Sequence, residues 1–369
     1  MVLNIQTDRP YDVYVENGVL QRAGELIKPL FKAGGKAMVI SDSNVYPLYG
    51  EQVRKSLVRA GFEGHSFVFP AGEQNKQLST VMQMYAALAE HGFTRSDFVV
   101  TLGGGVAGDM GGFAAATYLR GIDFVQIPTT LLSQVDASVG GKTAVDLPEG
   151  KNLVGAFHQP RLVLADPETL TSLPDEFFTD GMGEVVKHGC ILDPVLFDAL
   201  ERGAVLDRME AMIARNVACK KMLVEEDARD KGRRMLLNFG HTFGHGIEKL
   251  SGFSEISHGR AVAIGMVMAA EVGESLHVTP KGLSERIRNV LQAYGLPTES
   301  PYSFSEVMEA AALDKKTFGK QLNLILLEDI GKAVVHPVDR SYLILRHKLA
   351  EEQGRRNINT ENTTEETDG

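Results

Sequence analysis

The stretch DFVVTLGGGVAGDMGGFAAATYLRG, Asp97–Gly121, decides the fold. It runs from a short apolar segment, which predicts a strand, through three consecutive glycines into a helical pattern. Gly103, Gly105 and Gly108 have the G-x-G-x-x-G spacing of a dinucleotide-binding turn in the strand-to-helix context that the motif requires. Glycines let the backbone approach a pyrophosphate, and the amino end of the helix favours its charge. Because glycine turns also occur where a helix merely packs close to a strand, the motif alone leaves both interpretations open.

Segments that resemble this strand recur on both sides of it. They are rich in Val, Ile and Phe, and helical stretches such as residues 77–91 separate several of them. The predicted strands are residues 11–15, 36–41, 65–70, 97–102, 123–128 and 161–166. This alternation predicts an α/β class of fold, with a Rossmann-like NAD-binding domain and a mostly parallel sheet over residues 1–170.

The second half of the chain has a different character. Long helical patterns cover residues 175–189, 204–228, 234–250, 260–276 and 281–294. A hairpin is predicted from residues 321–328 and 332–338 around the tripeptide DIG. We therefore expect a mainly α-helical domain over residues 171–349, in which the candidate metal- and substrate-binding residues named below also lie. An acidic, disordered tail is expected over residues 350–369, which have no aromatic residue.

The composition excludes several classes of protein. The chain has 369 residues, 43% of them hydrophobic, and a net charge of −10, which argues against a nucleic-acid partner. No apolar run approaches the roughly 20 residues that a membrane span needs, and the amino terminus does not resemble a signal peptide. The two cysteines, Cys190 and Cys219, form no C-x-x-C pattern and are interpreted as packing residues. We expect a soluble, cytoplasmic protein that does not bind membranes.

A carboxylate for the ribose of a dinucleotide has two candidates. Asp123 lies about 20 residues after the glycines, as the fingerprint requires, but it begins a predicted strand instead of ending one. Asp42 ends the strand of residues 36–41, where a carboxylate can accept ribose hydroxyls. Since aspartates at strand ends are also common turn formers, the sequence leaves the role of Asp42 open.

A polar stripe follows in the second half. In RMLLNFGHTFGH, residues Arg234, Asn238, His241 and His245 are spaced so that one helix places them on one face. The two histidines have the spacing of the zinc-protease motif H-E-x-x-H, but the glutamate is missing. A solvated face would favour Glu and Lys, so the stripe is better interpreted as a site.

Other candidates are less specific. Glu184 and Lys187 are either a surface ion pair or a metal-binding carboxylate beside a substrate lysine. His258 either caps the next helix or binds metal, and a polar loop contains Lys142, Lys151 and Asn152. Together these residues indicate an NAD enzyme acting on a phosphorylated sugar or polyol, and a zinc-dependent polyol dehydrogenase fits equally well.

The motifs resemble those of the 3-dehydroquinate synthase family, in the same order, from about Tyr11 to His347. They are GEQNK, TLGGGVAGDMGGFAAATYLRG, QIPTTLLSQVDASVGGKTAVD, GKNLVGAFHQP, GMGEVVKHG, LLNFGHTFGHGIE and DKK. The resemblance implies NAD+, zinc or cobalt, and conversion of 3-deoxy-arabino-heptulosonate 7-phosphate to 3-dehydroquinate and phosphate. NAD+ is regenerated, so the implied enzyme is a lyase without net redox change.

The resemblance also assigns residues. It implies that the metal ligands are Glu184, His241 and His258, and that His245 lies on the substrate side. The implied cofactor residues are Asp42, Glu73, Lys76, Gly103, Gly104, Gly105, Asp109, Thr129, Thr130, Lys142, Lys151 and Ser172. The implied substrate residues are Arg120, Asp136, Lys142, Asn152, Lys187, Lys220, Arg234, Asn238, His245 and one lysine of DKK, Lys315 in preference to Lys316. Arg120 would reach in from a second subunit, which implies a homodimer.

The chain departs from the common family pattern at four places. Arg260 follows the ligand motif where an acid is usual, Gly183 replaces alanine, Ser172 replaces threonine, and one loop reads AVDLPEGKN. None of these removes an implied ligand. The rival sugar-phosphate cyclases, 2-deoxy-scyllo-inosose synthase and 2-epi-5-epi-valiolone synthase, share the cofactors. Valiolone-type enzymes tend to change the stripe asparagine, the second stripe histidine and the DKK lysine, all of which are retained here.

Overall fold

The computed structural model describes residues 1–252, 255–314 and 321–345. Lys315, Lys316 and the predicted acidic tail of residues 350–369 lie outside the described residues. The chain divides into two compact units, Met1–Met235 and the part that begins at Leu236. This division falls later than residue 170, where the sequence changes character, because three helices of the second half belong to the first compact unit.

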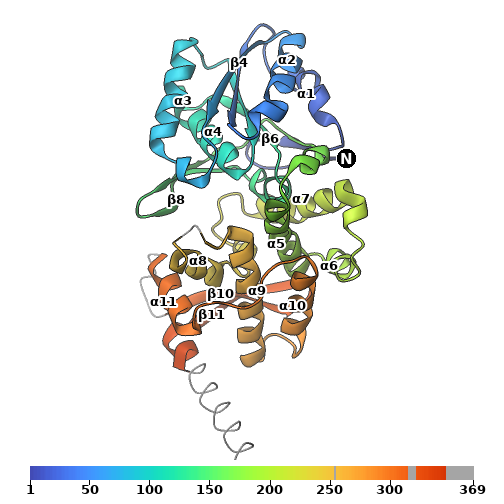
Figure 1. The fold of residues 1–369 in the computed structure, drawn as a ribbon, viewed down its shortest axis with the longest axis vertical. Coiled ribbons are helices and arrows are strands. Elements are labelled where there is room, and N and C mark those ends of the chain that lie inside the picture. The colour runs from blue at the N-terminus through green and yellow to red at the C-terminus, as the bar shows by residue number, and fades with distance from the viewer. Residues whose placement is uncertain (253–254, 315–320, 346–369) are drawn as a thin grey trace, which may run out of the picture. The chain divides into compact units, whose positions relative to one another are not determined.

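The first unit is built on a seven-stranded sheet (Figure 1). The strand order is β1-β2-β9-β6-β5-β3-β4. The strands are β1 (Val2–Ile5), β2 (Tyr11–Val15), β3 (Lys36–Asp42), β4 (Glu63–Phe69), β5 (Phe98–Gly103), β6 (Asp123–Pro128) and β9 (Leu162–Ala165). Only the edge pair β1–β2 is antiparallel within this described sheet. The α/β class and the mostly parallel sheet expected from the sequence are therefore confirmed.

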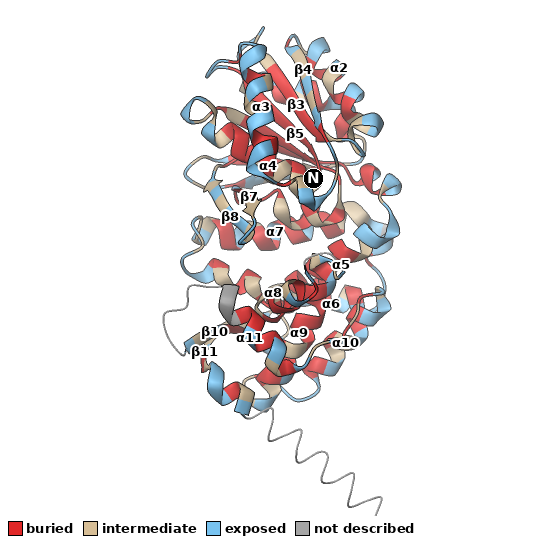
Figure 2. Ribbon diagram, turned by 60° about the vertical axis from the view of Figure 1, so that its left-hand side comes forward, coloured by how far each residue is buried: buried red, intermediate tan, exposed pale blue. Residues whose placement is uncertain are grey.

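Helices cover both faces of this sheet. On one side lie α1 (Ala23–Ile27) and α2 (Glu51–Arg59), and on the other α3 (Leu78–Glu90) and α4 (Gly105–Thr117) (Figure 1). Successive residues of a strand point to opposite faces, so Ala37 and Val39 pack with the first pair of helices and Met38 and Ile40 with the second. The central strands are consequently buried along their length (Figure 2), as parallel strands covered on both faces must be.

Three helices and one hairpin complete the first unit. The helices are α5 (Asp175–Ile191), α6 (Pro194–Glu201) and α7 (Met209–Glu226). The strands β7 (Lys142–Leu147) and β8 (Gly150–Phe157) form an antiparallel hairpin. The sequence analysis predicted a polar loop here. Helix α7 contacts β1, β2 and the short turn η6 (Ser133–Ala137), which attaches the helices to the sheet domain.

The second unit is mainly helical. It contains α8 (His241–Leu250), α9 (His258–Ser275), α10 (Leu283–Ala293) and α11 (Phe304–Asp314). The predicted hairpin is present as β10 (Gln321–Asp329) and β11 (Lys332–Asp339). The start of α8 and helix α9 pack so closely that a Cβ on Gly265 would lie only 2.0 Å from the carbonyl oxygen of Gly240.

The single helix predicted over residues 234–250 is wrong. Residues Arg233–Asn238 form a 3₁₀ turn, η9, and the α-helix begins only at His241. Gly240 precedes it with φ at +78°, a left-handed conformation that breaks helical continuity and that glycine adopts without strain. Arg234 and Asn238 therefore do not share one helical stripe with His241 and His245.

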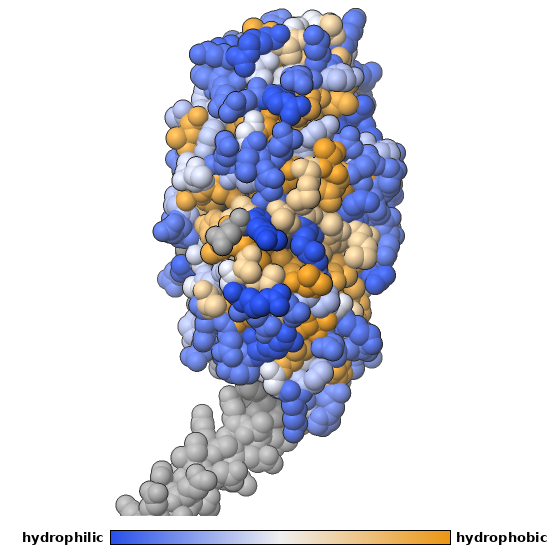
Figure 3. Space-filling model, turned by 90° about the vertical axis from the view of Figure 1, so that its right-hand side faces the viewer, coloured by the Kyte–Doolittle hydropathy of each residue, from blue (hydrophilic) through white to orange (hydrophobic). Residues whose placement is uncertain are grey.

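The surface of the described chain is mixed. On the face in Figure 3, hydrophobic residues occur in groups among hydrophilic ones. Exposed apolar side chains are spread over several helices, including Met82 on α3, Phe177 on α5 and Val195 on α6. Scattered exposed apolar residues are normal for a protein surface. Among the described residues, we find no helix whose length and hydropathy would suit a membrane span.

Candidate functional site

The glycine turn lies between β5 and α4, as the motif predicts. Gly103 ends the strand with φ at +151°, and a Cβ there would lie 2.8 Å from Cβ of Ala107. Glycines 103, 104 and 105 line a small hollow together with Asp109, Gln126 and Ser133. Because these three glycines have no side chain, the start of α4 is bare backbone beside the hollow, and the amino end of a helix suits a phosphate group.

Residues from neighbouring strand ends surround this turn. Asp42 ends β3, and its Oδ1 accepts hydrogen bonds from the backbone of Asn44 at 2.8 Å and Val45 at 3.0 Å. Asp42 therefore does form a turn, as one of the two interpretations held. Thr129 donates its backbone N–H to the carbonyl oxygen of Gly103 at 3.0 Å, which places the Thr129–Thr130 segment beside the glycines.

Ser172 lies elsewhere in the same unit and is already hydrogen bonded. Its hydroxyl shares a hydrogen bond with the hydroxyl of Tyr49 at 2.6 Å and donates to the carbonyl oxygen of Thr169 at 3.0 Å. Because one oxygen has a single proton, Ser172 keeps only acceptor capacity for a further partner if it donates to Thr169. The structure does not join Ser172 to the glycine turn by any hydrogen bond that it records.

Lys76 connects two of the predicted regions. Its ammonium pairs with Asp109 at 2.7 Å and donates to Oδ1 of Asn152 at 2.6 Å, and Glu73 lies 3.9 Å away. Lys76 is only 4% exposed. Burial lowers the pKa of Lys76, but the charges of Asp109 and Glu73 and the hydrogen bond to Asp109 together outweigh this and raise it, so the amine stays charged. Lys76 thus joins helix α4 to the β7–β8 hairpin, which contains Asn152, a predicted substrate residue.

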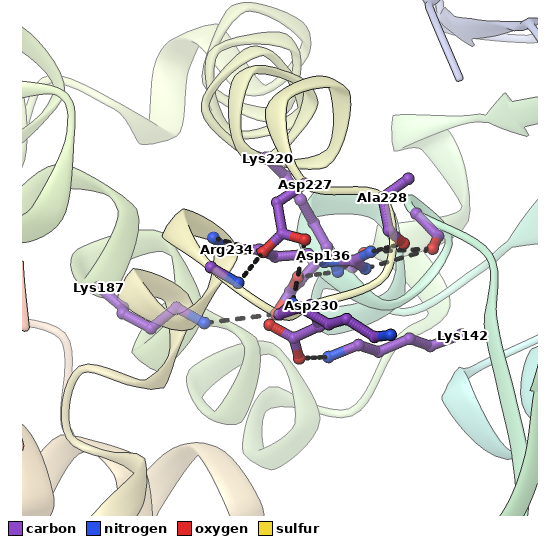
Figure 4. A network of polar contacts seen from close by, with 11 residues as sticks. Asp136, Lys142, Lys187, Lys220, Asp227, Ala228, Asp230 and Arg234 are labelled. Atoms are coloured by element: carbon purple, nitrogen blue, oxygen red, sulfur yellow. Dashed lines mark hydrogen bonds and ion pairs between the residues drawn. The ribbon is translucent and has the colours of Figure 1, made fainter. Parts of the chain in front are cut away.

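A second group of buried charges lies around η6 (Figure 4). Lys220 of α7 pairs with the carboxylate of Asp136 and also donates to its backbone carbonyl at 2.7 Å. Lys187 of α5 lies 3.5 Å from the same carboxylate. Burial raises the pKa of Asp136, but the charges of Lys220 and Lys187 hold it well below its usual range. The structure thus brings three predicted substrate residues together.

Burial has the opposite effect on Lys220. It lowers the pKa of this lysine to about 8, because the attraction of Asp136 does not offset the loss of hydration. Lys187 differs, since burial lowers its pKa but the carboxylates of Glu184 and Asp136 outweigh burial and raise it. At neutral pH both amines carry a charge, and Lys220 is the one that loses its proton first as the pH rises.

Arg234 completes this basic group from the turn that follows α7 (Figure 4). Only 1% exposed, it donates from Nη1 and Nη2 to the carbonyl oxygen of Gly140 at 3.2 and 3.3 Å. The loop before it is held by Asp227, whose carboxylate accepts backbone hydrogen bonds from Lys231, Gly232 and Arg234. An aspartate-organised loop thus fixes the position of a buried guanidinium group.

Lys142 is held differently from these buried cations. It is half exposed and pairs with Asp230, which belongs to the same loop as Asp227 (Figure 4). An exposed ion pair of this kind contributes little to stability. Lys142 is therefore the accessible cation of the cluster in Figure 4, whereas Lys187, Lys220 and Arg234 are buried.

Glu184 is buried on α5 and pairs with Lys187, so it is not an exposed surface ion pair. Potential ligand atoms of Glu184, Asp136 and His188 lie within 4.8 Å of one another. Because the ammonium of Lys187 contacts both carboxylates, a positive charge already lies among them. This group by itself is therefore a poor site for a metal ion.

His188 is a polar residue of this cluster that the sequence analysis did not single out. Its Nδ1 contacts Oδ1 of Asn216 at 3.0 Å, and Nδ2 of Asn216 donates to the carbonyl oxygen of Met212 at 2.8 Å. The amide oxygen can only accept, so Nδ1 carries the proton. Burial lowers the pKa of His188 to about 4, and the ring is neutral. Its position directly after Lys187 was the available signal in the sequence.

In the second unit, three histidines converge from two helices. His241 and His245 lie on α8, and His258 begins α9. The ring centroids of His241 and His258 are 5.2 Å apart, and those of His241 and His245 are 5.5 Å apart. Nδ1 of His241 donates to the carbonyl oxygen of Phe239 at 3.2 Å, which leaves its Nε2 as the ligating atom. The two histidines of the predicted ligand set are thus neighbours.

A buried carboxylate accompanies these histidines. Glu248 is 2% exposed, and its two carboxylate oxygens each lie 3.5 Å from Nδ1 of His258. The sequence analysis did not assign it. The available signal was its spacing of seven residues from His241 and three from His245, which puts it on the same face of α8.

The other predicted residues are placed by the elements that carry them, or they lie outside the described chain. Arg120 is exposed after α4 with φ at +69°, directly after Leu119 at +50°. Asn238 is partly buried at the end of η9, and Lys151 lies beside Asn152 on β8. Lys315 lies outside the described residues. Glu184 belongs to the first unit and the histidines to the second, so the three-ligand metal site stays a prediction.

The chain is similar to known proteins over most of its length. The family model described as "3-dehydroquinate synthase N-terminal" matches residues 66–180, and "3-dehydroquinate synthase C-terminal" matches residues 181–317. The 3-dehydroquinate synthase of Clostridium acetobutylicum is 45% identical over 343 residues, which cover 91% of this chain and 96% of that protein.

Solved structures with the same fold include two synthases. A structure of 2-deoxy-scyllo-inosose synthase with carbaglucose-6-phosphate, NAD+ and Co²⁺ has a TM-score of 0.83 and 28% identity, and covers 93% of this chain and 98% of that one. A structure of 2-epi-5-epi-valiolone synthase from Streptomyces hygroscopicus with NAD+ and Zn²⁺ has a TM-score of 0.82 and 29% identity, and covers 95% and 99%.

Proposed function

The chain belongs to the 3-dehydroquinate synthase family, and from this we propose that it converts 3-deoxy-D-arabino-heptulosonate 7-phosphate to 3-dehydroquinate and inorganic phosphate. The reaction comprises oxidation of one hydroxyl group, elimination of phosphate, reduction of the ketone, ring opening and aldol closure. The cofactor returns to its oxidised form, so the proposed enzyme is a carbon–oxygen lyase of the shikimate pathway.

For NAD+, the residues fit. The turn of Gly103, Gly104 and Gly105 presents backbone without side chains at the start of α4, and a pyrophosphate requires this. Asp42 lies at the end of β3 beside the turn, where a ribose binds in folds of this class. The remaining proposed cofactor residues are Glu73, Lys76, Asp109, Thr129, Thr130, Lys142, Lys151 and Ser172.

A divalent metal also fits. In both His241 and His258, Nδ1 faces an oxygen acceptor, so Nε2 is the nitrogen that would bind a metal. Imidazole with carboxylate is a donor set that suits zinc. We propose Glu184, His241 and His258 as the ligands, with zinc as the metal and cobalt as a substitute. When bound, NAD+ accepts and returns a hydride, and the metal polarises the hydroxyl group that is oxidised.

The chain's own residues hold the anionic substrate. Lys187, Lys220 and Arg234 are buried cations in an acidic protein, and Lys142 adds an accessible one. They would bind the phosphate and carboxylate groups by charge-assisted hydrogen bonds. Asp136 positions both lysine amines. This buried basic group carries the proposal, because a dehydrogenase of the glycerol type has a neutral substrate and needs no such group.

His245 is proposed to act on the substrate side of the stripe. It lies one helical turn after His241 on α8, and an imidazole titrates near neutral pH. Asn238 and Lys315 are proposed to contact the same substrate, and Arg120 to enter the site of a second subunit in a homodimer. Retention of Asn238, His245 and Lys315 favours dehydroquinate synthesis over the valiolone reaction.

The proposal is tested by following phosphate and NADH together. The purified protein is mixed with NAD+, zinc and 3-deoxy-D-arabino-heptulosonate 7-phosphate, with and without a chelator. We expect metal-dependent phosphate release, 3-dehydroquinate as product and no accumulation of NADH. Phosphate release only from glucose 6-phosphate would assign the chain to the inosose branch, and phosphate-free NADH formation from a polyol would mean a dehydrogenase.

A further inference from the structure

We propose that Glu248 is a positioning residue that fixes the ring orientation and tautomer of His258, a proposed metal ligand. The inference rests on the metal site proposed above. It concerns a residue that none of the predicted ligand, cofactor or substrate sets contains.

The geometry around Glu248 supports this role. Both carboxylate oxygens lie 3.5 Å from Nδ1 of His258, and the side chain comes from the inner part of α8, where only 2% of the residue is exposed. Potential ligand atoms of His245, Glu248 and His258 lie within 4.8 Å of one another. The carboxylate therefore lies against the metal-ligand histidine and close to the substrate-side histidine at the same time.

The chemistry of the two groups determines which nitrogen carries the proton. A carboxylate only accepts hydrogen bonds, so Nδ1 of His258 is the protonated nitrogen and Nε2 carries the lone pair. His241 reaches the same state by donating Nδ1–H to the carbonyl oxygen of Phe239. Both histidines therefore present Nε2 as the ligating nitrogen, one through a backbone acceptor and the other through Glu248.

The contact between Nδ1 and Glu248 is long, at 3.5 Å. A metal on Nε2 withdraws electron density from the ring, which makes Nδ1–H a stronger donor, and carboxylates in this position raise the basicity of the ligand. We expect the contact to shorten when metal binds. Loss of such a partner typically weakens metal affinity by about 10- to 100-fold.

Two other roles make different predictions. As a direct ligand, Glu248 would bind the metal itself together with His245 and His258, and its loss would change the coordination of bound cobalt. As a purely structural residue, Glu248 would affect folding without changing the tautomer of His258. The contact of both oxygens with Nδ1 favours the positioning role, because a ligating carboxylate directs an oxygen at the metal instead.

The test uses the full chain with Glu248→Gln and Glu248→Leu, and Glu285→Gln as a matched control. Glu285 is an exposed carboxylate on α10. Zinc affinity is measured by competition with a chromophoric chelator, the cobalt site by visible absorption, and the tautomers of the histidines by ¹⁵N NMR of the metal-free protein. Wild-type phosphate release, measured separately, tests the proposed function itself.

We expect Glu248→Gln to bind zinc about 10- to 100-fold more weakly, because it lacks the negative charge that raises the basicity of His258. Its cobalt spectrum should not change, since the amide oxygen still accepts from Nδ1. In Glu248→Leu, the Nε2–H tautomer of His258 should appear, while Glu285→Gln behaves as wild type. Wild-type zinc affinity in the glutamine variant, an Nε2–H tautomer in the wild type, or an altered cobalt spectrum in the glutamine variant would each overturn the proposal. The wild-type tautomer and the glutamine variant decide the question even if Glu248→Leu does not fold.

Discussion

Replacing Asp136 by asparagine removes the negative charge between two buried amines, and the structure predicts how the cost depends on pH. In the wild type, the folded-state pKa of Lys220 is about 8, below its ordinary value of 10.5. The unfolded chain therefore binds more protons than the folded one between these values, and this lysine makes stability rise with pH across that window. Without Asp136, the pKa of Lys220 falls further, because burial then acts without a paired charge.

The magnitude follows from the proton that Lys220 can release. At pH 7 the wild-type amine is charged, about one pH unit below its pKa. In the Asp136→Asn variant, Lys220 can lose its proton instead of remaining as an unpaired buried charge. The decrease in the free energy of unfolding that comes from Lys220 is therefore limited to about 1.4 kcal/mol at pH 7, the value of one pKa unit. This is well below the roughly 3–5 kcal/mol expected when a buried charge is left unpaired and cannot neutralise. At pH 9 wild-type Lys220 is already mostly neutral, so its contribution to the destabilisation by Asp136→Asn should nearly vanish.

Urea denaturation at pH 7 and pH 9 measures these differences, provided that the slope of the transition is the same in both proteins. Lys220→Met and the double variant with Asp136→Asn are the matched controls, since without the lysine the effect of Asp136→Asn should not depend on pH in this range. A destabilisation by Asp136→Asn of equal size at pH 7 and pH 9 would refute the reasoning. So would a pH dependence that survives in the Lys220→Met background.

Three further predictions concern the same unit. Gly111→Ala places a Cβ 2.5 Å from Cγ2 of Thr101. It should destabilise the protein by about 1–3 kcal/mol, as measured by thermal or urea unfolding. Adding Thr101→Ser, which removes that methyl group, should restore most of the lost stability. Above pH 8, KM for the phosphorylated substrate should rise as Lys220 loses its charge, and a KM that stays flat to pH 9.5 would exclude Lys220 from anion binding. Asp230→Asn, which keeps a residue that tolerates the left-handed backbone at φ +55°, should change stability by less than about 1 kcal/mol because its partner Lys142 is half exposed. A larger loss would mean that the carboxylate of Asp230 supports the loop itself.

The parallel sheet could be predicted because its signals are local. Each central strand is a short apolar run, and the glycine turn marks the junction of β5 and α4. The β7–β8 hairpin was missed because its sequence is rich in polar residues and glycine, so the alternation that marks a half-buried strand is weak there. The broken helix was missed because glycine is tolerated inside helices, and the sequence does not show that Gly240 adopts a left-handed conformation.

The candidate site was predictable in its residue types but not in its pairings. The resemblance assigns Lys187 and Lys220 to the substrate, yet their shared partner Asp136 is distant from both along the chain. Burial decides that Lys220 has a lowered pKa and that His188 is neutral, and neither is visible without the fold. Glu248 could have been found from its place on the face of α8, but its contact with His258 depends on how α8 packs against α9.

The attachment of α7 to β1, β2 and η6 has a practical consequence for exchanging segments between related enzymes. A recombination point near residue 170, where the composition changes, would give α7 a foreign set of strands and take Lys220 and its partner Asp136 from different parents. A recombination point between Met235 and Leu236 keeps the first compact unit intact and brings Asn238, His241 and His245 in together with the second. Chimeras joined at that point should retain soluble expression more often than chimeras joined at residue 170.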